Sequence, residues 1–159
     1  MKKKIKWTLL TILVIFLAAQ LYQPERTNPP VDASQTIYAT LHVPPEVRAV
    51  LERSCNDCHS HNTRWPWYSY IAPTSWLTAG DVTKGRTMMN LSIWGTYKKT
   101  RQITKLGQIS DQLEEDEMPL KPYRFMHPSA VLSEAEIQLV SNWAENERDR
   151  LTGADSTDN

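Results

Sequence analysis

Apolar side chains recur at steps of three and four residues through much of residues 34–151, and no stretch alternates apolar and polar positions as a strand would. The pattern predicts one all-α domain with long loops. Four helices are expected, at residues 44–54, from Thr74 or Ser75 through Leu77, at residues 93–115 and at residues 133–150. The last of these begins with a capping box, because Ser133 is followed three residues later by Glu136.

The N-terminus has a different pattern, in which Lys2, Lys3, Lys4 and Lys6 precede an apolar run from Trp7 to Tyr22. This order of charge and hydrophobicity is typical of an export signal or a membrane anchor. Because no small-residue cleavage site follows the run, we expect an uncleaved transmembrane helix within residues 1–23, with a cleaved signal as the alternative. The positive-inside rule then predicts a single-pass protein of the cytoplasmic (inner) membrane whose domain faces the periplasm.

Residues 24–34 contain three prolines among polar side chains, which predicts an extended spacer between the anchor and the domain. The domain itself is expected at residues 35–151. Residues 152–159 are small and acidic, so we expect a disordered tail there.

The length and charge of the chain exclude some classes of protein. A chain of 159 residues with 40% hydrophobic residues suits one globular domain. Four of its 18 basic residues are the N-terminal lysines, so the rest of the chain carries 14 basic and 18 acidic side chains, a net charge of −4. This balance argues against a nucleic-acid partner.

One short motif has a strong chemical meaning. Cys55, Cys58 and His59 form a C-x-x-C-H sequence, the signature of covalent haem attachment. Two thiols at this spacing can each add to one vinyl group of a single porphyrin, and the adjacent imidazole then binds the iron. The expected cofactor is therefore one covalent haem c, with His59 as an iron ligand.

Three other chemistries fit the two cysteines less well. A C-x-x-C disulfide closes too small a loop to stabilise a fold, and a thioredoxin-like pair belongs in a βαβ pattern that this sequence lacks. A zinc site needs four ligands, and only the other histidines remain to complete it: His42, His61 and His127.

The sixth position on the iron is expected to be filled by Met118, which precedes Pro119 just beyond the predicted long helix. A methionine there can reach across a crevice from His59, although a lone methionine also serves as a packing residue. His127 is the next candidate, and an open position is the third possibility.

The chain also resembles known haem proteins. A helix leading into C-x-x-C-H, a Met-Pro loop and a capped final helix resemble class I c-type cytochromes. The sequence is more similar to membrane-anchored bacterial haem-binding domain proteins, through the following positions: Cys55-x-x-Cys58-His59-Ser60, Trp65-Pro66-Trp67-Tyr68, Pro73, Ser75-Trp76, Gly85-Arg86, Met118-Pro119-Leu120, Tyr123, His127-Pro128, Leu132-Ser133 and Trp143.

This resemblance implies a cytochrome c-like helical domain in which the first and last helices cross near the haem edge, with Leu51 and Trp143 as contacts. The loop from Ser60 to Ser75 departs from ordinary small cytochromes. Its aromatic residues could line the haem or pack a small core, and Arg64 or Arg86 could bind a haem propionate.

Together these observations predict a membrane-anchored monohaem c-type cytochrome that is not an enzyme and transfers single electrons between periplasmic or membrane redox partners. The acidic run at residues 111–117 could steer a basic partner, or be only a solvated helix face. The alternatives are a haem-based sensor or peroxidase-like protein with an open or labile sixth position, and a haemless dithiol domain.

Overall fold

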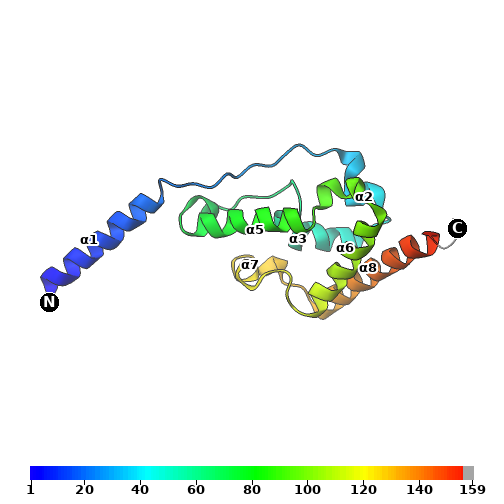
Figure 1. The fold of residues 1–159 in the computed structure, drawn as a ribbon. Helices are drawn as coiled ribbons and strands as arrows, with labels where there is room; N and C mark the ends of the chain where they lie inside the picture. The colour runs from blue at the N-terminus through cyan, green and yellow to red at the C-terminus, as the bar shows by residue number, and fades with distance from the viewer. Residues whose placement is uncertain (156–159) are drawn as a thin grey trace.

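The computed structural model describes residues 1–155, in which every regular element is a helix and no strand occurs (Figure 1). The predicted all-α class is therefore confirmed. The α-helices are α1 (Lys2–Ala19), α2 (Ile37–Thr40), α3 (Pro45–Ser54), α4 (Asn56–His59), α5 (Thr74–Met88), α6 (Lys99–Glu114), α7 (Lys121–Met126) and α8 (Glu134–Asp155). Four short 3₁₀ helices connect them: η1 (Ala33–Gln35), η2 (Trp67–Tyr70), η3 (Leu91–Thr96) and η4 (Pro128–Ala130).

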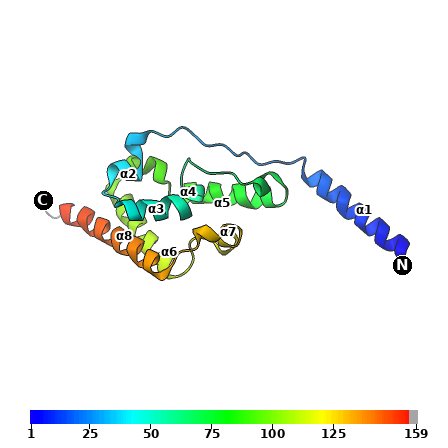
Figure 2. The ribbon, with the colours of Figure 1, turned by 180° about the vertical axis from the view of Figure 1, so that it is seen from behind.

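The core forms where α6 and α3 pack against α8 (Figure 2). Leu106 of α6, Leu51 of α3 and Val140 of α8 are almost completely buried in one hydrophobic cluster. Trp143 of α8 belongs to the same cluster, and its indole N–H donates a hydrogen bond to the carbonyl of His42 over 2.9 Å. Leu51 and Trp143 thus lie in one core, and α3, which leads into the cysteine motif, is held by the last helix.

Local sequence signals explain two of these helices well. α3 begins at Pro45 and ends at Ser54, as predicted. The capping box of α8 is formed as well, because Glu136 accepts hydrogen bonds from both the amide and the hydroxyl of Ser133 over 2.9 Å. α8 continues to Asp155, so the first part of the predicted tail is helical, whereas residues 156–159 lie outside the described residues.

The predicted helix over residues 93–115 is wrong in its first part. The chain forms η3 there, and Tyr97 and Lys98 then adopt extended conformations before α6 begins. The break is stabilised by side chains, since Gln102 donates to the carbonyls of Trp94 and Tyr97, each over 3.2 Å. α5, by contrast, runs through both of its glycines as far as Met88.

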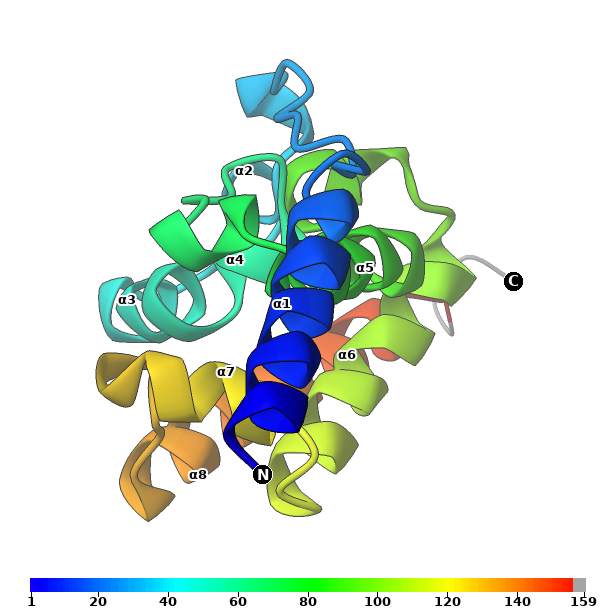
Figure 3. The ribbon, with the colours of Figure 1, turned by 90° about the vertical axis from the view of Figure 1, so that its left-hand side faces the viewer.

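The predicted transmembrane helix is also wrong. α1 has 18 residues, of which four are lysines, and it ends at Ala19 instead of continuing to Tyr22. No helix in residues 1–155 combines the length and the apolar character that a membrane span requires. The expected single-pass location in the inner membrane is therefore not supported. α1 extends away from the helical domain and buries none of its residues (Figures 1 and 3).

The segment after α1 is more than a spacer, because its polar groups bind the domain. We call residues 20–31 the N-terminal strap. The side chain of Gln20 exchanges two hydrogen bonds with the backbone of Ala72, and the indole of Trp76 donates to the carbonyl of Tyr22 over 2.9 Å. Asn28 donates to the carbonyl of Thr63 over 2.9 Å, so the strap reaches the loop that follows the cysteine motif.

Candidate functional site

The cysteine motif lies on a short helical turn directly after α3. The amide of His59 donates to the carbonyl of Cys55 over 2.9 Å, so the chain closes one helical turn between these residues. Residues three and four apart lie on the same side of such a turn. Cys55, Cys58 and His59 therefore face one side of α4, and both cysteines are free thiols.

The two thiols do not have the character of a redox dithiol. Burial raises the pKa of Cys55 and that of Cys58 to about 12, so both side chains stay protonated in the folded chain. Thiol–disulfide enzymes need the opposite, a thiolate stabilised near neutral pH. In addition, the described residues contain no group of three or more His, Cys, Asp or Glu side chains that could hold a metal ion.

His59 is oriented for metal binding by the end of α5. Its Nδ1 lies 3.1 Å from the carbonyl oxygen of Met89. A carbonyl can only accept, so Nδ1 carries the proton and Nε2 keeps its lone pair for a metal ion. Burial also lowers the pKa of His59 below its ordinary value of 6.5, which favours the neutral imidazole that binds iron.

α5 approaches the motif so closely that only glycine fits at the contact. A Cβ atom on Gly85 would lie 2.5 Å from the carbonyl oxygen of Cys58 and 3.0 Å from its carbonyl carbon. Gly85 therefore allows the backbones of α4 and α5 to touch. The same part of α5 provides the Met89 carbonyl that orients His59, so this close approach positions the expected iron ligand.

Arg86 holds the chain that follows His59. Its Nε donates to the carbonyl of Ser60 over 2.8 Å, and Nη2 donates to the hydroxyl of Thr63 over 2.9 Å. Nη1 and Nη2 also donate to Thr27 and Asn28 of the N-terminal strap. All three guanidinium nitrogens are thus bonded to the chain, and Arg86 joins the strap to the segment that follows the motif.

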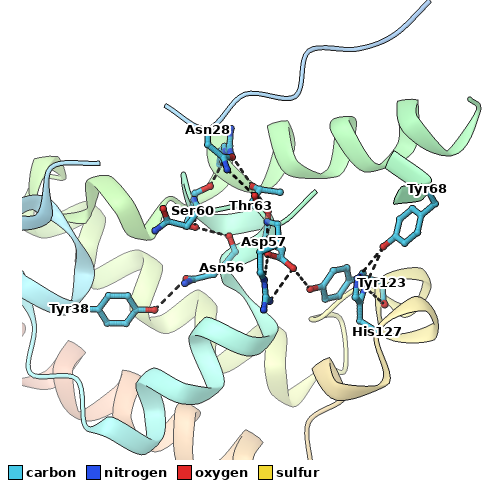
Figure 4. A network of polar contacts seen from close by, with 12 residues as sticks. Asn28, Tyr38, Asn56, Asp57, Ser60, Thr63, Tyr68, Tyr123 and His127 are labelled. Carbon is cyan, nitrogen blue, oxygen red and sulfur yellow. Dashed lines mark hydrogen bonds and ion pairs between the residues drawn. The ribbon is translucent and has the colours of Figure 1, made fainter. Parts of the chain in front are cut away.

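Asp57, inside the motif, anchors two other segments (Figure 4). Its carboxylate is buried and accepts from the amide of Arg64 at 3.0 Å and from its guanidinium at 3.1 and 3.3 Å. It also accepts a 2.8 Å hydrogen bond from the hydroxyl of Tyr123 on α7. Burial raises the pKa of Tyr123 above its ordinary value of 10.0, so this hydroxyl remains a donor.

Met118 lies in the loop that joins α6 to α7. The loop begins at Asp116, whose φ of 56° is left-handed and turns the chain away from α6. Met118 then donates its amide to the carbonyl of Gln112 over 3.1 Å, and its side chain packs half-buried against the hydrophobic core that Cys55 also contacts. The structure therefore brings both the motif and Met118 to the edge of one core.

The other predicted ligands are less available. The Nε2 of His127 lies 3.3 Å from the hydroxyl of Tyr68, and its Nδ1 lies 3.2 Å from the carbonyl of Tyr123. The ring of His127 also stacks on Tyr123, with 4.2 Å between ring centroids. His127, the next candidate for the sixth position, is thus engaged on both nitrogens and on one face.

The aromatic residues after the motif have different environments. Trp67 is exposed and Trp76 contacts the strap, whereas Tyr68 is buried. Trp65 has a buried indole N–H without a partner among the described residues. Such an orphaned donor fits a carboxylate on a bound group, because a buried donor left unpaired is costly.

Sequence reasoning singled out Cys55, Cys58, His59 and Met118, but it did not identify the residues that position the motif and the Met118 loop. Asp57 and Tyr123 are 66 residues apart, and no spacing rule links them. Gly85 is conspicuous only as a glycine inside a helical pattern, where it signals a close backbone contact without naming the partner.

The donor set fits a haem: two thiols on one helical turn, an imidazole whose Nδ1 is bonded to a carbonyl, and a half-buried thioether at the edge of the core that Cys55 also contacts. Residues 14–146 match the haem-binding domain family. No curated protein and no solved structure matches the chain significantly, so the resemblance to class I cytochromes is not supported. Because the family match covers most of the chain and contains every residue of this site, the chain belongs to the haem-binding domain family.

Proposed function

We propose that this haem-binding protein attaches one haem covalently through Cys55 and Cys58 and uses it to transfer single electrons. The observation that carries the proposal is the orientation of His59, whose Nδ1 lies 3.1 Å from the carbonyl oxygen of Met89, so that Nε2 is the ring nitrogen that keeps its lone pair. This histidine directly follows two unpaired thiols on the same helical turn. A covalent c-type haem needs this combination of groups.

The haem, when bound, supplies a one-electron iron couple, and the protein supplies fixation and ligation. α4 carries the attachment residues, while Gly85 and Arg86 fix α4 against α5. The hydrophobic core beside Cys55 excludes water from one side of the site. Transfer of an electron requires no catalytic acid, base or nucleophile from the chain.

Met118 is the proposed sixth ligand. Its side chain is half-buried against the core beside the motif, and its backbone is fixed by the turn after α6. His127 is the weaker choice, because both of its nitrogens have partners within the chain. A thioether ligand raises the reduction potential compared with a second histidine.

Acidic side chains next to Met118 support an electron-transfer role with a basic partner. Asp111, Glu114, Glu115 and Glu117 are exposed on the last turns of α6 and on the loop that follows. Charge of one sign near a redox site increases the rate of encounter with a partner of opposite charge. The rate of electron exchange with a basic redox protein should therefore fall as ionic strength rises.

The test is to express the full chain together with a cytochrome c maturation system. The proposal is supported if each chain carries one haem that stays attached after denaturation. The ferric protein should also show the thioether absorption band, and the reduced protein should not bind carbon monoxide. Replacing both cysteines with alanine should abolish the covalent haem, with Thr78→Ala on α5 as a control that leaves it in place. Absence of covalent haem in the wild type would refute the attachment, and ready binding of carbon monoxide would favour a sensor or peroxidase-like protein.

A further inference from the structure

The loop that carries Met118 is closed on itself. Arg124 of α7 makes a bidentate contact with Asp116, with Nη1 to Oδ1 at 2.6 Å and Nη2 to Oδ2 at 3.2 Å. Asp116 is also the residue in the left-handed conformation that ends α6. Residues 116–124 therefore form a loop whose two ends are joined by an ion pair.

Tyr123 connects this closed loop to the haem motif. Its hydroxyl donates to Asp57 over 2.8 Å, and Figure 4 shows the ring of Tyr123 pointing from α7 toward α4. Asp57 itself does not depend on this bond for its position, because the amide and the guanidinium of Arg64 also donate to it. The motif thus offers an acceptor that Arg64 holds in place, and Tyr123 is the donor that α7 brings to it.

We propose that Tyr123 is a positioning residue that holds the Met118 loop against the haem motif and so determines whether Met118 occupies the sixth position on the iron. The inference rests on the proposed function, because it presumes a haem on Cys55 and Cys58. It assigns a role to Asp57 as well. This carboxylate inside the C-x-x-C-H sequence accepts the hydrogen bond from Tyr123 and so connects the motif to the Met118 loop.

The size of the effect follows from the bond that is lost. A hydrogen bond to a charged group typically changes an equilibrium by about ten- to a hundredfold. Removing it shifts the Met118 loop toward the undocked state by that factor. An external ligand such as imidazole binds the iron only when the loop is undocked, so its apparent affinity rises with the undocked fraction.

The experiment compares Tyr123→Phe with the wild type in the haem-loaded full chain. Imidazole should bind the ferric variant about ten- to a hundredfold more tightly, and the thioether absorption band should disappear at correspondingly lower imidazole concentration. Tyr70→Phe is the matched control, because Tyr70 is exposed on η2 and its ring packs against the guanidinium of the strap residue Arg26. Its affinity for imidazole should equal that of the wild type.

The same substitution in a chain that lacks Met118 distinguishes a specific effect on the Met118 loop from a general loosening of the fold. In Met118→Ala there is no thioether to displace, so adding Tyr123→Phe should no longer change imidazole affinity. If Tyr123→Phe has the same effect with and without Met118, or has no effect in the wild-type background, the inference is overturned.

Failure of the proposed function has a different signature. If the wild type carries no covalent haem, the proposed function fails, and amide hydrogen exchange of the haem-free chain then decides the inference. Faster exchange at residues 118–127 in Tyr123→Phe, but not in Tyr70→Phe, supports docking by Tyr123. Equal exchange in both variants overturns it.

Discussion

Replacing Gly85 with alanine tests whether α5 truly touches the haem motif. The added Cβ would lie 2.5 Å from the carbonyl oxygen of Cys58, 3.0 Å from its carbonyl carbon and 3.2 Å from its Cβ. Two of these three atoms are backbone, which cannot rotate away. The contact must open to at least 3.4 Å before it becomes ordinary, so α4 and α5 have to separate.

Two opposing contributions determine how much the substitution changes the free energy of unfolding. Overpacking of this kind costs about 1–3 kcal/mol, whereas alanine in a helix is favoured over glycine by about 1 kcal/mol. Because the clash involves backbone on both sides, we expect the clash to dominate and the free energy of unfolding to fall by about 1–2 kcal/mol. The same shift moves the Met89 carbonyl away from His59, so the yield of six-coordinate haem protein should fall too.

Gly80 provides the control within the same helix. A Cβ atom there meets nothing within 4 Å, so only the helix preference remains. Gly80→Ala should raise the free energy of unfolding by up to about 1 kcal/mol. Urea denaturation of the haem-free full chain, followed by tryptophan fluorescence, measures both variants. If Gly85→Ala stabilises the chain as much as Gly80→Ala does, the close contact between α4 and α5 is wrong.

Three further predictions concern the core, the last helix and the strap. Leu106 is fully buried, so Leu106→Ala should lower the free energy of unfolding by about 2–5 kcal/mol. Leu77 is exposed, so Leu77→Ala should change it by less than about 0.5 kcal/mol. If urea denaturation gives the same stability for both variants, Leu106 is not a core residue. The hydrogen bonds from Ser133 lower the pKa of Glu136 below its ordinary value of 4.5, so the stability that this carboxylate adds is complete above pH 4.5 and is lost as the pH falls through the lowered value. Unfolding of Glu136→Gln should therefore depend less on pH below 4.5 than unfolding of the wild type, and equal slopes count against the capping box. Asn28→Ala should speed proteolysis within residues 20–31, since it releases the strap from the carbonyl of Thr63, and an unchanged cleavage rate would show that the strap is held elsewhere.

The parts of the fold that could be predicted are those set by neighbouring residues. α3 and α8 were predictable because a proline start and a capping box act within one turn of chain. The break before α6 was not, because it depends on Gln102 bonding to carbonyls of the preceding 3₁₀ helix. The error at α1 has another cause: the apolar run extends from Trp7 to Tyr22 in the sequence, but the helix that forms includes the four lysines and ends at Ala19.

The same distinction explains the site. C-x-x-C-H is a local motif, so its chemistry can be predicted from five consecutive residues. The groups that orient the motif come from distant parts of the chain. His59 is bonded to the carbonyl of Met89, and Asp57 to the hydroxyl of Tyr123. These partners use a backbone atom and a common side chain, which leave little trace in a single sequence.

These contacts show that different residues of the motif have different roles. The proposed haem-binding residues face one side of α4, while the other positions connect the motif to the rest of the fold. Asp57 binds α7, the carbonyl of Cys58 touches α5, and the carbonyl of Ser60 accepts from Arg86, which also binds the N-terminal strap. Each surrounding segment therefore acts on the motif through an atom that is not an iron ligand. Changes in these segments should alter the geometry and potential of the haem without altering its attachment, because covalent attachment requires only the two thiols.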